Sequence, residues 1–238
     1  MSSAPKWVFD TVELFMPKLP LAEVKETEFL SQFVKKIQFT GDFKNQNFQV
    51  GSYIDFRVTD TDSRRYTISY ADIENGVLEI IVHLHGDGNG SEFMDNLKTG
   101  DKISLNKPRT DLRYYDRTVE KYVIFGDETS LGLACSFLPA LQKNNHKFQF
   151  IFELDDENKS VPELLGLKNC FIFTKNGLFR DEEWMGDLPV LTIPEWWEAN
   201  FILTGNVKSA QTFRKVIKDK INGKVYLHGY WLEGKKGL

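Results

Sequence analysis

Short stretches in which apolar and polar residues alternate dominate the first half of the chain. The alternation is clearest in Val-Lys-Lys-Ile-Gln-Phe at 34–39 and in Leu-Glu-Ile-Ile-Val-His at 78–83. A two-residue period predicts β-strands with one buried face, and Gly, Pro, Asn and Asp lie between the stretches. Because these strands follow one another without long helices, we expect a closed or nearly closed antiparallel β-barrel. The expected strands cover residues 7–15, 19–27, 33–40, 53–59, 66–70, 77–85 and 102–105.

The second half of the chain has a different pattern, in which compact apolar stretches alternate with helical ones. Helices are expected from about residue 131 to Lys143 and over 210–221. Strands that alternate with helices predict βαβ units and a parallel sheet. Since the change falls within the polar stretch 111–117, we expect two domains, a barrel over 1–117 and an α/β parallel-sheet domain over 118–238. The expected strands of the sheet are 121–125, 148–153, 169–173, 199–203 and 224–227.

Composition and charge exclude several classes of protein. A net charge of −4 argues against a nucleic-acid partner, which usually meets a basic patch. No apolar run is long enough to cross a bilayer and no signal peptide is visible, so we expect a cytoplasmic protein. The two isolated cysteines, Cys135 and Cys170, favour a reducing compartment and are too few to ligate an iron–sulfur cluster. We also expect no metal site, because the four histidines lack zinc spacing. The oligomeric state stays open.

The segment Arg64-Arg65-Tyr66-Thr67 lies in an expected strand. In a strand, residues two apart share a face, so Arg64 and Tyr66 point one way and Arg65 and Thr67 the other. A guanidinium suits a pyrophosphate because its fork makes paired charge-assisted bonds. The aromatic ring and the threonine hydroxyl suit a flat heterocycle. By itself the segment is equally compatible with an ordinary strand that carries an exposed arginine and a half-buried tyrosine.

The segment from His85 to Ser91 is rich in glycine and directly precedes a short helix expected over 91–97. Ser91 is the expected N-cap of that helix. Gly88-Asn89-Gly90-Ser91 would let a ligand approach the backbone closely, and the amides at the helix start form an anion site. A flexible surface turn with a serine cap is the alternative.

In this order the motifs resemble those of the ferredoxin–NADP reductase superfamily, and more narrowly those of the siderophore-interacting proteins, FAD-dependent ferric-siderophore reductases. The resemblance implies an FAD-binding barrel followed by an NAD(P)-binding α/β domain. Arg64 would bind the FAD pyrophosphate, and Tyr66 and Thr67 would line the isoalloxazine ring. The match is carried by Arg64 to Thr67, by His83 and His85 with the Gly88-Asn89-Gly90-Ser91 phosphate cradle, by Gly126-Asp127-Glu128-Thr129-Ser130, and by Gly229-Tyr230-Trp231-x-x-Gly234.

Gly126 to Ser130 lies at the carboxyl end of the first strand of the expected parallel sheet, where nucleotides usually bind. Asp127 and Glu128 would repel a pyrophosphate held against them. A helix cap, with Thr129 or Ser130 as the N-cap residue, is therefore the alternative to a nucleotide site. The resemblance implies that Gly126, Asp127, Thr129 and Ser130 contact NADH or NADPH.

Three further features lie at other strand ends. The resemblance places Thr204 and Gly205 beside the nicotinamide, although a plain strand-to-helix turn is equally compatible. It also implies that Tyr230 and Trp231 cover the flavin, whereas packing of the last strand is the simpler account. The acidic stretch 153–157 favours NADH over NADPH, because a carboxylate suits a ribose 2′-hydroxyl, unless the stretch is only a solvated turn.

We therefore expect an NAD(P)H-dependent flavoprotein reductase. The cofactor carries the redox chemistry, so no catalytic acid or base is required and none is assigned. By the resemblance the electron acceptor is a ferric siderophore or a similar ferric chelate. Two alternatives stay open: a reductase for a ferredoxin, a flavodoxin or free flavin, and a non-catalytic flavin-binding module.

Overall fold

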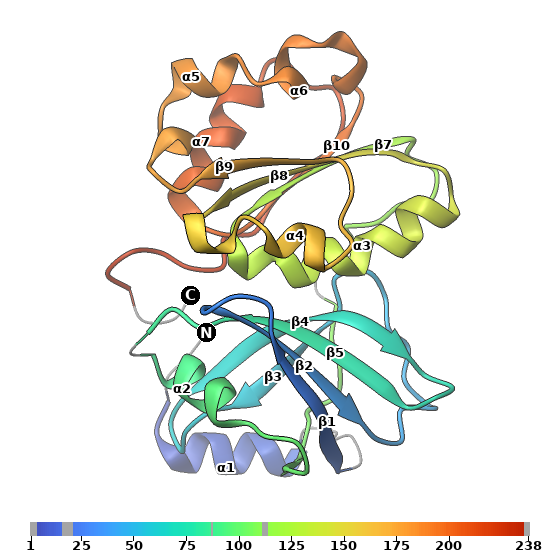
Figure 1. Cartoon of the computed structure of the whole chain (residues 1–238), viewed down its shortest axis with the longest axis vertical. Coiled ribbons are helices and arrows are strands. Elements are labelled where there is room, and N and C mark those ends of the chain that lie inside the picture. The colour runs from blue at the N-terminus through green and yellow to red at the C-terminus, as the bar shows by residue number, and fades with distance from the viewer. Residues whose placement is uncertain (1–3, 16–20, 87, 111–113, 236–238) are drawn as a thin grey trace. The chain divides into compact units, whose positions relative to one another are not determined.

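The computed structural model describes residues 4–15, 21–86, 88–110 and 114–235. The chain divides into two compact units between residues 113 and 114. The first unit runs from blue to green in Figure 1 and the second from yellow-green to red. Each unit is described by itself. A separate biochemical role for each, with a boundary at 117/118, stays a prediction, and residues 111–113 of the polar stretch lie outside the described residues.

The strands of the first unit form one antiparallel sheet in the order β3-β4-β5-β2-β1-β6. The chain beyond β6 returns to the opposite edge of the sheet. There the N–H of Tyr53 donates to the carbonyl of Arg109 at 2.9 Å and the reverse bond is 3.0 Å. The sheet is therefore nearly closed, and the expected antiparallel barrel is confirmed. The strands are β1 (Ala22–Phe29), β2 (Val34–Thr40), β3 (Tyr53–Arg57), β4 (Ser63–Asp72), β5 (Val77–His83) and β6 (Lys102–Ile103).

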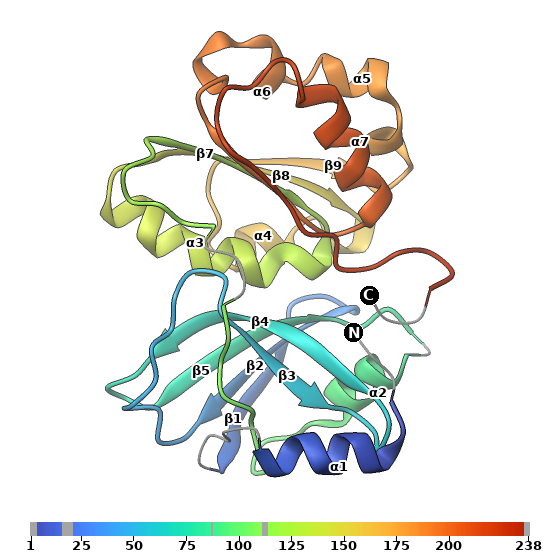
Figure 2. The same ribbon diagram turned by 180° about the vertical axis from the view of Figure 1, so that it is seen from behind.

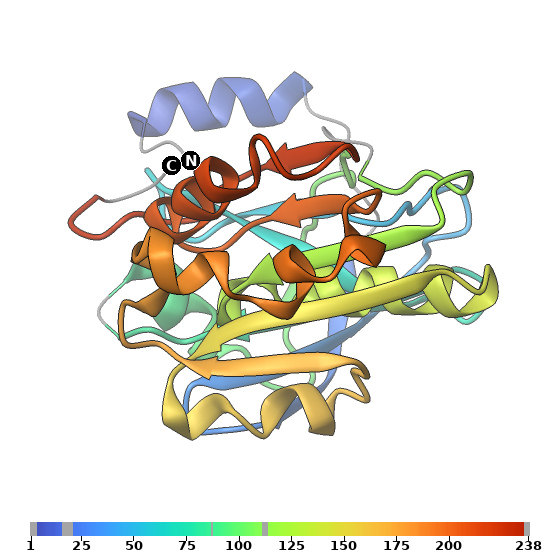
Figure 3. The same cartoon turned by 90° about the horizontal axis from the view of Figure 1, so that it is seen from above.

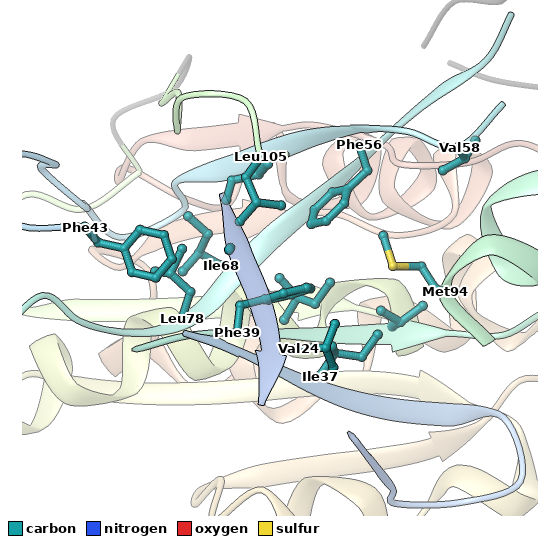
Figure 4. Close-up of a cluster of buried hydrophobic side chains, with 14 of the residues drawn as sticks. Val24, Ile37, Phe39, Phe43, Phe56, Val58, Ile68, Leu78, Met94 and Leu105 are labelled. Atoms are coloured by element: carbon teal, nitrogen blue, oxygen red, sulfur yellow. The ribbon is translucent and has the colours of Figure 1, made fainter. Parts of the chain in front are cut away.

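Alternating residues of the strands fill the interior of the barrel (Figure 4). Ile37 lies opposite Ile80, and Phe39 lies opposite Leu78, in the β2–β5 pair. All four side chains are buried in one cluster. Met94 of the helix α2 (Asn89–Asn96) enters the same cluster and is fully buried. The period-two pattern thus builds the core, and α2 is attached to it through an apolar contact.

The expected strand at 7–15 is wrong, because these residues form the helix α1 (Lys6–Phe15). Apolar residues recur at 8, 12 and 15, which is also helical spacing, and this period prevails over the strand preference of the aromatic residues. Trp7 and Phe15 are 71% and 83% exposed, so no sheet face buries them. Arg57 Nη1 at the end of β3 donates to Asp10 Oδ1 at 2.9 Å and ties the helix to the barrel (Figure 2).

The second unit has a five-stranded parallel sheet in the order β11-β10-β7-β8-β9. Figure 3 shows its strands running in the same direction, and this confirms the expected parallel sheet. The helices α3 and α4 cover one face of the sheet, and α5, α6 and α7 cover the other (Figure 1). The strands are β7 (Lys121–Gly126), β8 (Lys147–Leu154), β9 (Cys170–Thr174), β10 (Asn200–Leu203) and β11 (Val225–Leu227). The helices are α3 (Leu131–Lys143), α4 (Val161–Leu164), α5 (Glu182–Gly186), α6 (Pro189–Thr192) and α7 (Val207–Ile217), with 3₁₀ turns η1 (Glu128–Ser130), η2 (Asp156–Asn158), η3 (Leu178–Arg180) and η4 (Pro194–Trp196).

Aromatic rings in tilted and edge-on contact hold the α7 face of this sheet. The ring of Phe125 on β7 lies 4.8 Å from that of Phe179 and 5.1 Å from that of Phe213 on α7. All three side chains are fully buried. This packing fixes the carboxyl end of β7, which ends one residue later at Gly126, relative to α7. Among the described residues, no helix is both long and apolar enough to span a membrane.

Candidate functional site

The β4 motif and the start of α2 meet within the first unit. Arg64 and Tyr66 lie opposite Phe56 and Ile54 of β3, and they share one face of β4. A Cβ atom placed on Gly90 would lie 2.9 Å from Arg64 Cγ and 2.9 Å from the Tyr66 hydroxyl. Both distances are shorter than ordinary van der Waals contact, so the close approach requires a glycine. The structure therefore brings Arg64, Tyr66 and Gly90 together.

The ring of Tyr66 packs against the apolar core of the barrel. Its ring lies 5.5 Å from the ring of Phe56 in an edge-on arrangement. Burial raises the pKa of the Tyr66 phenol far above its ordinary value, and the guanidinium of Arg64 opposes this only in part. The phenol therefore keeps its proton at neutral pH and can donate a hydrogen bond.

The next residues along β4 face the other way. Arg65 Nε donates to Asp55 Oδ1 at 3.2 Å, and the Arg65 guanidinium lies 3.7 Å from the centre of the Tyr53 ring. Thr67 lies opposite Tyr53 and is half-buried. The two adjacent arginines thus have separate roles. Arg65 holds β4 to β3, whereas Arg64 lies against Gly90, where its Nη1 donates to the Ser63 carbonyl at 2.9 Å.

Ser91 is not the N-cap of the helix, contrary to the prediction. The helix α2 begins at Asn89, and Gly88 is the N-cap residue without a side-chain bond. Ser91 lies inside the first turn and is buried, and its Oγ accepts a hydrogen bond from the backbone N–H of His85 at 3.2 Å. The Asn89 amide donates to the Asp62 carboxylate. Side chains of the first turn therefore fix the helix to the barrel rather than capping it.

His83 and His85 lie side by side at the end of β5, with their ring centres 5.9 Å apart. Residues two apart in an extended chain share a face, which accounts for this neighbourhood. A Cβ atom on Gly88 would lie 3.2 Å from His85 Cε1. His85 thus contacts the residue that starts α2, and both histidines lie close to the glycine-rich segment.

In the second unit, the two predicted segments lie at the carboxyl ends of adjacent strands. The chain proceeds from β7 to β8 and β9 on one side, and β10 and β11 lie on the other side of β7. The strand order therefore reverses between β7 and β10, which is where doubly wound sheets bind ligands. Gly126 ends β7, and Thr204-Gly205 follows β10.

These strand ends pack very closely. Thr204 Oγ1 donates to the Phe125 carbonyl and lies 2.9 Å from Ser130 Oγ. A Cβ atom on Gly126 would lie 2.2 Å from Ser130 Oγ, so only glycine fits there. Thr204 and Ser130 are fully buried. Sequence analysis placed these residues at one site, and the structure places them together inside the fold.

Asp127 caps the 3₁₀ turn η1 after β7, and Ser130, one of the two predicted residues, is the N-cap residue of α3 but makes no side-chain cap bond. Asp127 Oδ1 accepts from the Thr129 N–H at 2.9 Å. Asp127 Oδ2 accepts from the indole N–H of Trp231, and Gly205 approaches so closely that an added Cβ would lie 2.8 Å from Asp127 Cγ. Asp127 is fully buried. Its carboxylate is therefore used within the unit, and it supplies the side-chain capping bond of this segment.

Glu128, whose charge was expected to repel a pyrophosphate, is neutralised by a buried ion pair. Glu128 is fully buried and pairs with the ammonium of Lys175. Glu128 Oε1 accepts from the Asp155 N–H at 2.7 Å and from the Asn158 amide at 3.0 Å. Burial disfavours the charge of Lys175, but the neighbouring carboxylates, Asp127 first, outweigh it and raise the pKa of the ammonium.

The acidic stretch after β8 is likewise paired. Lys175 Nζ lies 3.3 Å from Asp155 Oδ2, and Lys159 Nζ lies 2.7 Å from Asp156 Oδ1. The stretch is therefore a mixed ionic surface rather than a run of free carboxylates. Sequence analysis missed Lys175, although its position directly after β9, at the same edge of the sheet, was a usable signal.

Glu153 is a second residue that sequence analysis assigned only to the acidic stretch. It lies on β8 and is 3% exposed. Burial raises the pKa of Glu153 to about 7, and a hydrogen bond from Ser209 on α7 opposes the shift. The carboxylate of Asp127 raises the pKa of Glu153 further. A carboxyl group whose pKa is raised to about 7 by burial therefore lies near the carboxyl edge of this sheet.

The segment from Gly229 to Trp231 continues along the end of β10. The N–H of Tyr230 donates to the Gly205 carbonyl at 2.8 Å, and the N–H of Val207 donates to the Trp231 carbonyl at 2.9 Å. Trp231 thus packs within the second unit, with its indole on Asp127. Tyr230 lies against His228, with 5.3 Å between ring centres. A role of either aromatic residue in covering the flavin stays a prediction.

Residues 21–114 match the family model of the oxidoreductase FAD-binding domain. The match covers most of the first unit, which is therefore similar to an oxidoreductase FAD-binding domain. The match contains β4, the glycine-rich segment and α2, and therefore the predicted flavin-site residues other than Tyr230 and Trp231.

Comparison with solved structures extends the likeness to the fold of the whole chain. The siderophore-interacting protein SipS from Aeromonas hydrophila is 20% identical, with a TM-score of 0.72 over 92% of this chain and 94% of that one. The siderophore-interacting protein from Acinetobacter baumannii is 19% identical, with a TM-score of 0.73 over 93% of each chain. Phthalate dioxygenase reductase is 14% identical, with a TM-score of 0.72 over 91% of this chain and 70% of that one. No curated protein matched the chain in a sequence search. The resemblance to the siderophore-interacting proteins and the wider reductase superfamily is confirmed in the fold.

The residues of the FAD-binding domain suit a flavin dinucleotide. The first N–H groups of a helix have no partner within the helix and form its positive end. In α2 these groups follow Gly88, whose own N–H donates to the Gly86 carbonyl at 2.7 Å, and the Cβ and Cγ atoms of Arg64 lie against Gly90 in the first turn. This donor set matches a pyrophosphate. The protonated phenol of Tyr66 adds a donor and an aromatic ring next to it.

The raised pKa of Glu153 predicts a pH-dependent stability of the second unit. The folded protein binds more protons than the unfolded chain between pH 4.5 and about 7, so the contribution of Glu153 to stability falls as the pH rises through this window. Relative to the wild type, Glu153→Gln should gain up to about 3 kcal/mol of unfolding free energy between pH 5 and 8. Urea denaturation across this range measures the difference.

Glu157→Gln is the matched control, because Glu157 is exposed in the same acidic stretch. Its difference from the wild type should stay nearly constant across the pH range. If Glu153→Gln also ran parallel to the wild type, the carboxyl group would not titrate near neutrality in the folded protein.

Proposed function

We propose that the chain is an NAD(P)H-dependent flavoprotein reductase whose acceptor is a ferric siderophore or a similar ferric chelate. The observation that carries the proposal is the convergence of Arg64, Tyr66 and Gly90 in an oxidoreductase FAD-binding domain. Bound FAD would supply hydride acceptance and one-electron transfer, so the protein's part is binding, orientation and exclusion of water.

In this proposal, different residues of the first unit bind different parts of the flavin. Arg64 and the backbone amides from Gly88 to Ser91 bind the pyrophosphate. Tyr66 and Thr67 line the isoalloxazine ring, and Tyr66 donates from its protonated hydroxyl. His83 and His85 border the same glycine-rich segment.

The carboxyl edge of the second sheet is the proposed site of the pyridine nucleotide. Support comes from the reversal of strand order between β7 and β10. At these strand ends Gly126 and Gly205 have no side chains that would cover the backbone. Lys175 compensates the charge of Glu128, which removes the main electrostatic objection to an anionic ligand. The acidic residues after β8 support NADH as the preferred nucleotide, to be checked by the ratio of kcat/KM values for NADH and NADPH.

The proposed acceptor rests on the likeness to siderophore-interacting proteins over more than nine-tenths of both chains. It also rests on the chain's having two cysteines, too few to ligate an iron–sulfur cluster. Electrons would then leave the flavin directly for a small ferric chelate. Assays with purified protein and NADH, comparing ferric chelates with ferredoxin, flavodoxin and free flavin, separate the possible acceptors.

One observation favours a second candidate, a flavin-binding module without nicotinamide turnover. The indole of Trp231 and the backbone of Gly205 both lie against Asp127, at the place where a nicotinamide would be expected. If this packing persists, the edge of the sheet offers little room for the ring.

Anaerobic mixing of the FAD-loaded protein with NADH distinguishes these two functions. A reductase should bleach the flavin absorbance near 450 nm within seconds, in keeping with ordinary turnover of about 1–10³ per second. Trp231→Phe removes the indole donor and should leave this rate unchanged or raise it. A flavin that stays oxidised in both proteins would favour the binding module.

The two adjacent arginines give a direct test of the flavin site. Arg64→Met should raise the Kd for FAD about tenfold or more, because it removes a charge-assisted contact with the pyrophosphate. The Kd for riboflavin, which has no phosphate, should change little. Arg65→Met is the control, since Arg65 pairs with Asp55 on the other face. Equal losses for both flavins would contradict the role of Arg64. Fluorescence titration of the apoprotein measures the constants.

The glycines of the cradle provide an independent steric test. Gly90→Ala should raise the Kd for FAD about tenfold, because overpacking against Arg64 and Tyr66 costs on the order of 1–3 kcal/mol. Gly88→Ala should have a smaller effect, since its added carbon meets only the edge of the His85 ring. Similar effects at both positions would contradict the assigned close approach. The same titration checks both variants.

A further inference from the structure

Lys35 is a charged residue buried inside the FAD-binding domain. It lies on β2 beside Val82 of β5 and is 2% exposed. Its ammonium donates three hydrogen bonds to backbone carbonyls at the end of α2. The bonds reach Met94 O at 3.0 Å, Asp95 O at 2.7 Å and Leu97 O at 3.0 Å.

This arrangement satisfies the hydrogen-bond donors of Lys35 and the carbonyl acceptors at the end of the helix. The last carbonyls of a helix have no partner within it and form its negative end. An ammonium group has three donors and here finds three such carbonyls. Burial lowers the pKa of Lys35, and the nearby carboxylate of Asp95 opposes that shift. The positive charge is thus placed where the helix itself compensates it.

Attachment of α2 to the barrel does not by itself require this buried charge. Met94 already anchors the helix in the apolar core, and an apolar side chain at position 35 would avoid the cost of desolvating an ammonium. Met94 contributes non-directional contact, whereas three hydrogen bonds fix the direction of the helix end. Lys35 therefore constrains orientation more than attachment.

The opposite end of α2 is the proposed pyrophosphate site. The helix has eight residues and a length of about 12 Å, so its two ends are only about two turns apart. Its first turn is held by Asn89 on Asp62 and by Ser91 on the backbone of His85. A change of direction at the carbonyl end would carry the first-turn amides away from Arg64.

We propose that Lys35 is a positioning residue for the flavin pyrophosphate, which it never contacts. From inside the barrel it holds the carbonyl end of α2 and so aims the amide end of that helix at the phosphate groups beside Arg64. The inference rests on the proposed flavin site. It adds a determinant of FAD affinity on a strand outside the sequence motifs that contact the cofactor.

The test compares FAD with riboflavin, because only FAD presents phosphates to α2. Lys35→Met should raise the Kd for FAD about tenfold, the effect of losing one aligned charge-assisted hydrogen bond, and the Kd for riboflavin less than about threefold. Lys35→Gln keeps two N–H donors for the carbonyls and should fold readily. It should show the same selective loss to a smaller degree.

Lys36→Met is the matched control, because Lys36 is the next residue of β2 and pairs with Glu28 on the other face. It should change neither constant. If the Lys35 variants weaken FAD and riboflavin by the same factor, or leave both unchanged, the positioning role is wrong. A wild-type protein that binds FAD no better than riboflavin would instead contradict the proposed pyrophosphate site itself. The failure of one proposal is therefore distinguishable from the failure of the other.

Discussion

The contact of Gly90 with the side chains of Arg64 and Tyr66 joins the two halves of the flavin site. Because Gly90 has no side chain, the first turn of α2 can lie directly against β4. That approach places the positive end of a helix next to the side chain of an arginine and a protonated phenol. Each of these groups is common on protein surfaces, and the specific chemistry arises only from their proximity. The rest of the barrel serves to keep this contact in place.

Several weak constraints act together on α2. Met94 provides apolar attachment, Asn89 and Ser91 fix the first turn, and Lys35 fixes the last one. The division of labour follows from the interactions themselves, since apolar burial is non-directional and hydrogen bonds are directional. A short helix whose amides are to bind an anion must be both attached to the domain and correctly oriented. The apolar core of the barrel attaches α2, and the buried ammonium of Lys35 orients it.

The second unit has a different problem at the carboxyl edge of its sheet. Several carboxylates lie there, where an anionic nucleotide is proposed to bind, and three of them are buried. Asp127 accepts from the Trp231 indole, Glu128 pairs with Lys175, and Glu153 has a pKa near neutrality. Partners within the unit therefore compensate much of the negative charge of these carboxyl groups. The same partners fill space, so access for a nicotinamide depends on whether Trp231 stays on Asp127.

The sequence by itself determined the fold class, because local periods of two and of about 3.6 residues encode strands and helices directly. The spacing of Arg64 and Tyr66 on one strand face followed from the same rule. The proposed flavin site followed from the resemblance of its motifs to a known superfamily. Where two periods fitted equally well, as at 7–15, the sequence misassigned α1. Only the tertiary structure decided the contact of Trp231 with Asp127, the Lys175–Glu128 pair and the contact of Lys35 with the end of α2. These depend on residues distant in the chain that the fold brings together, and no local pattern records which partner a buried charge will find.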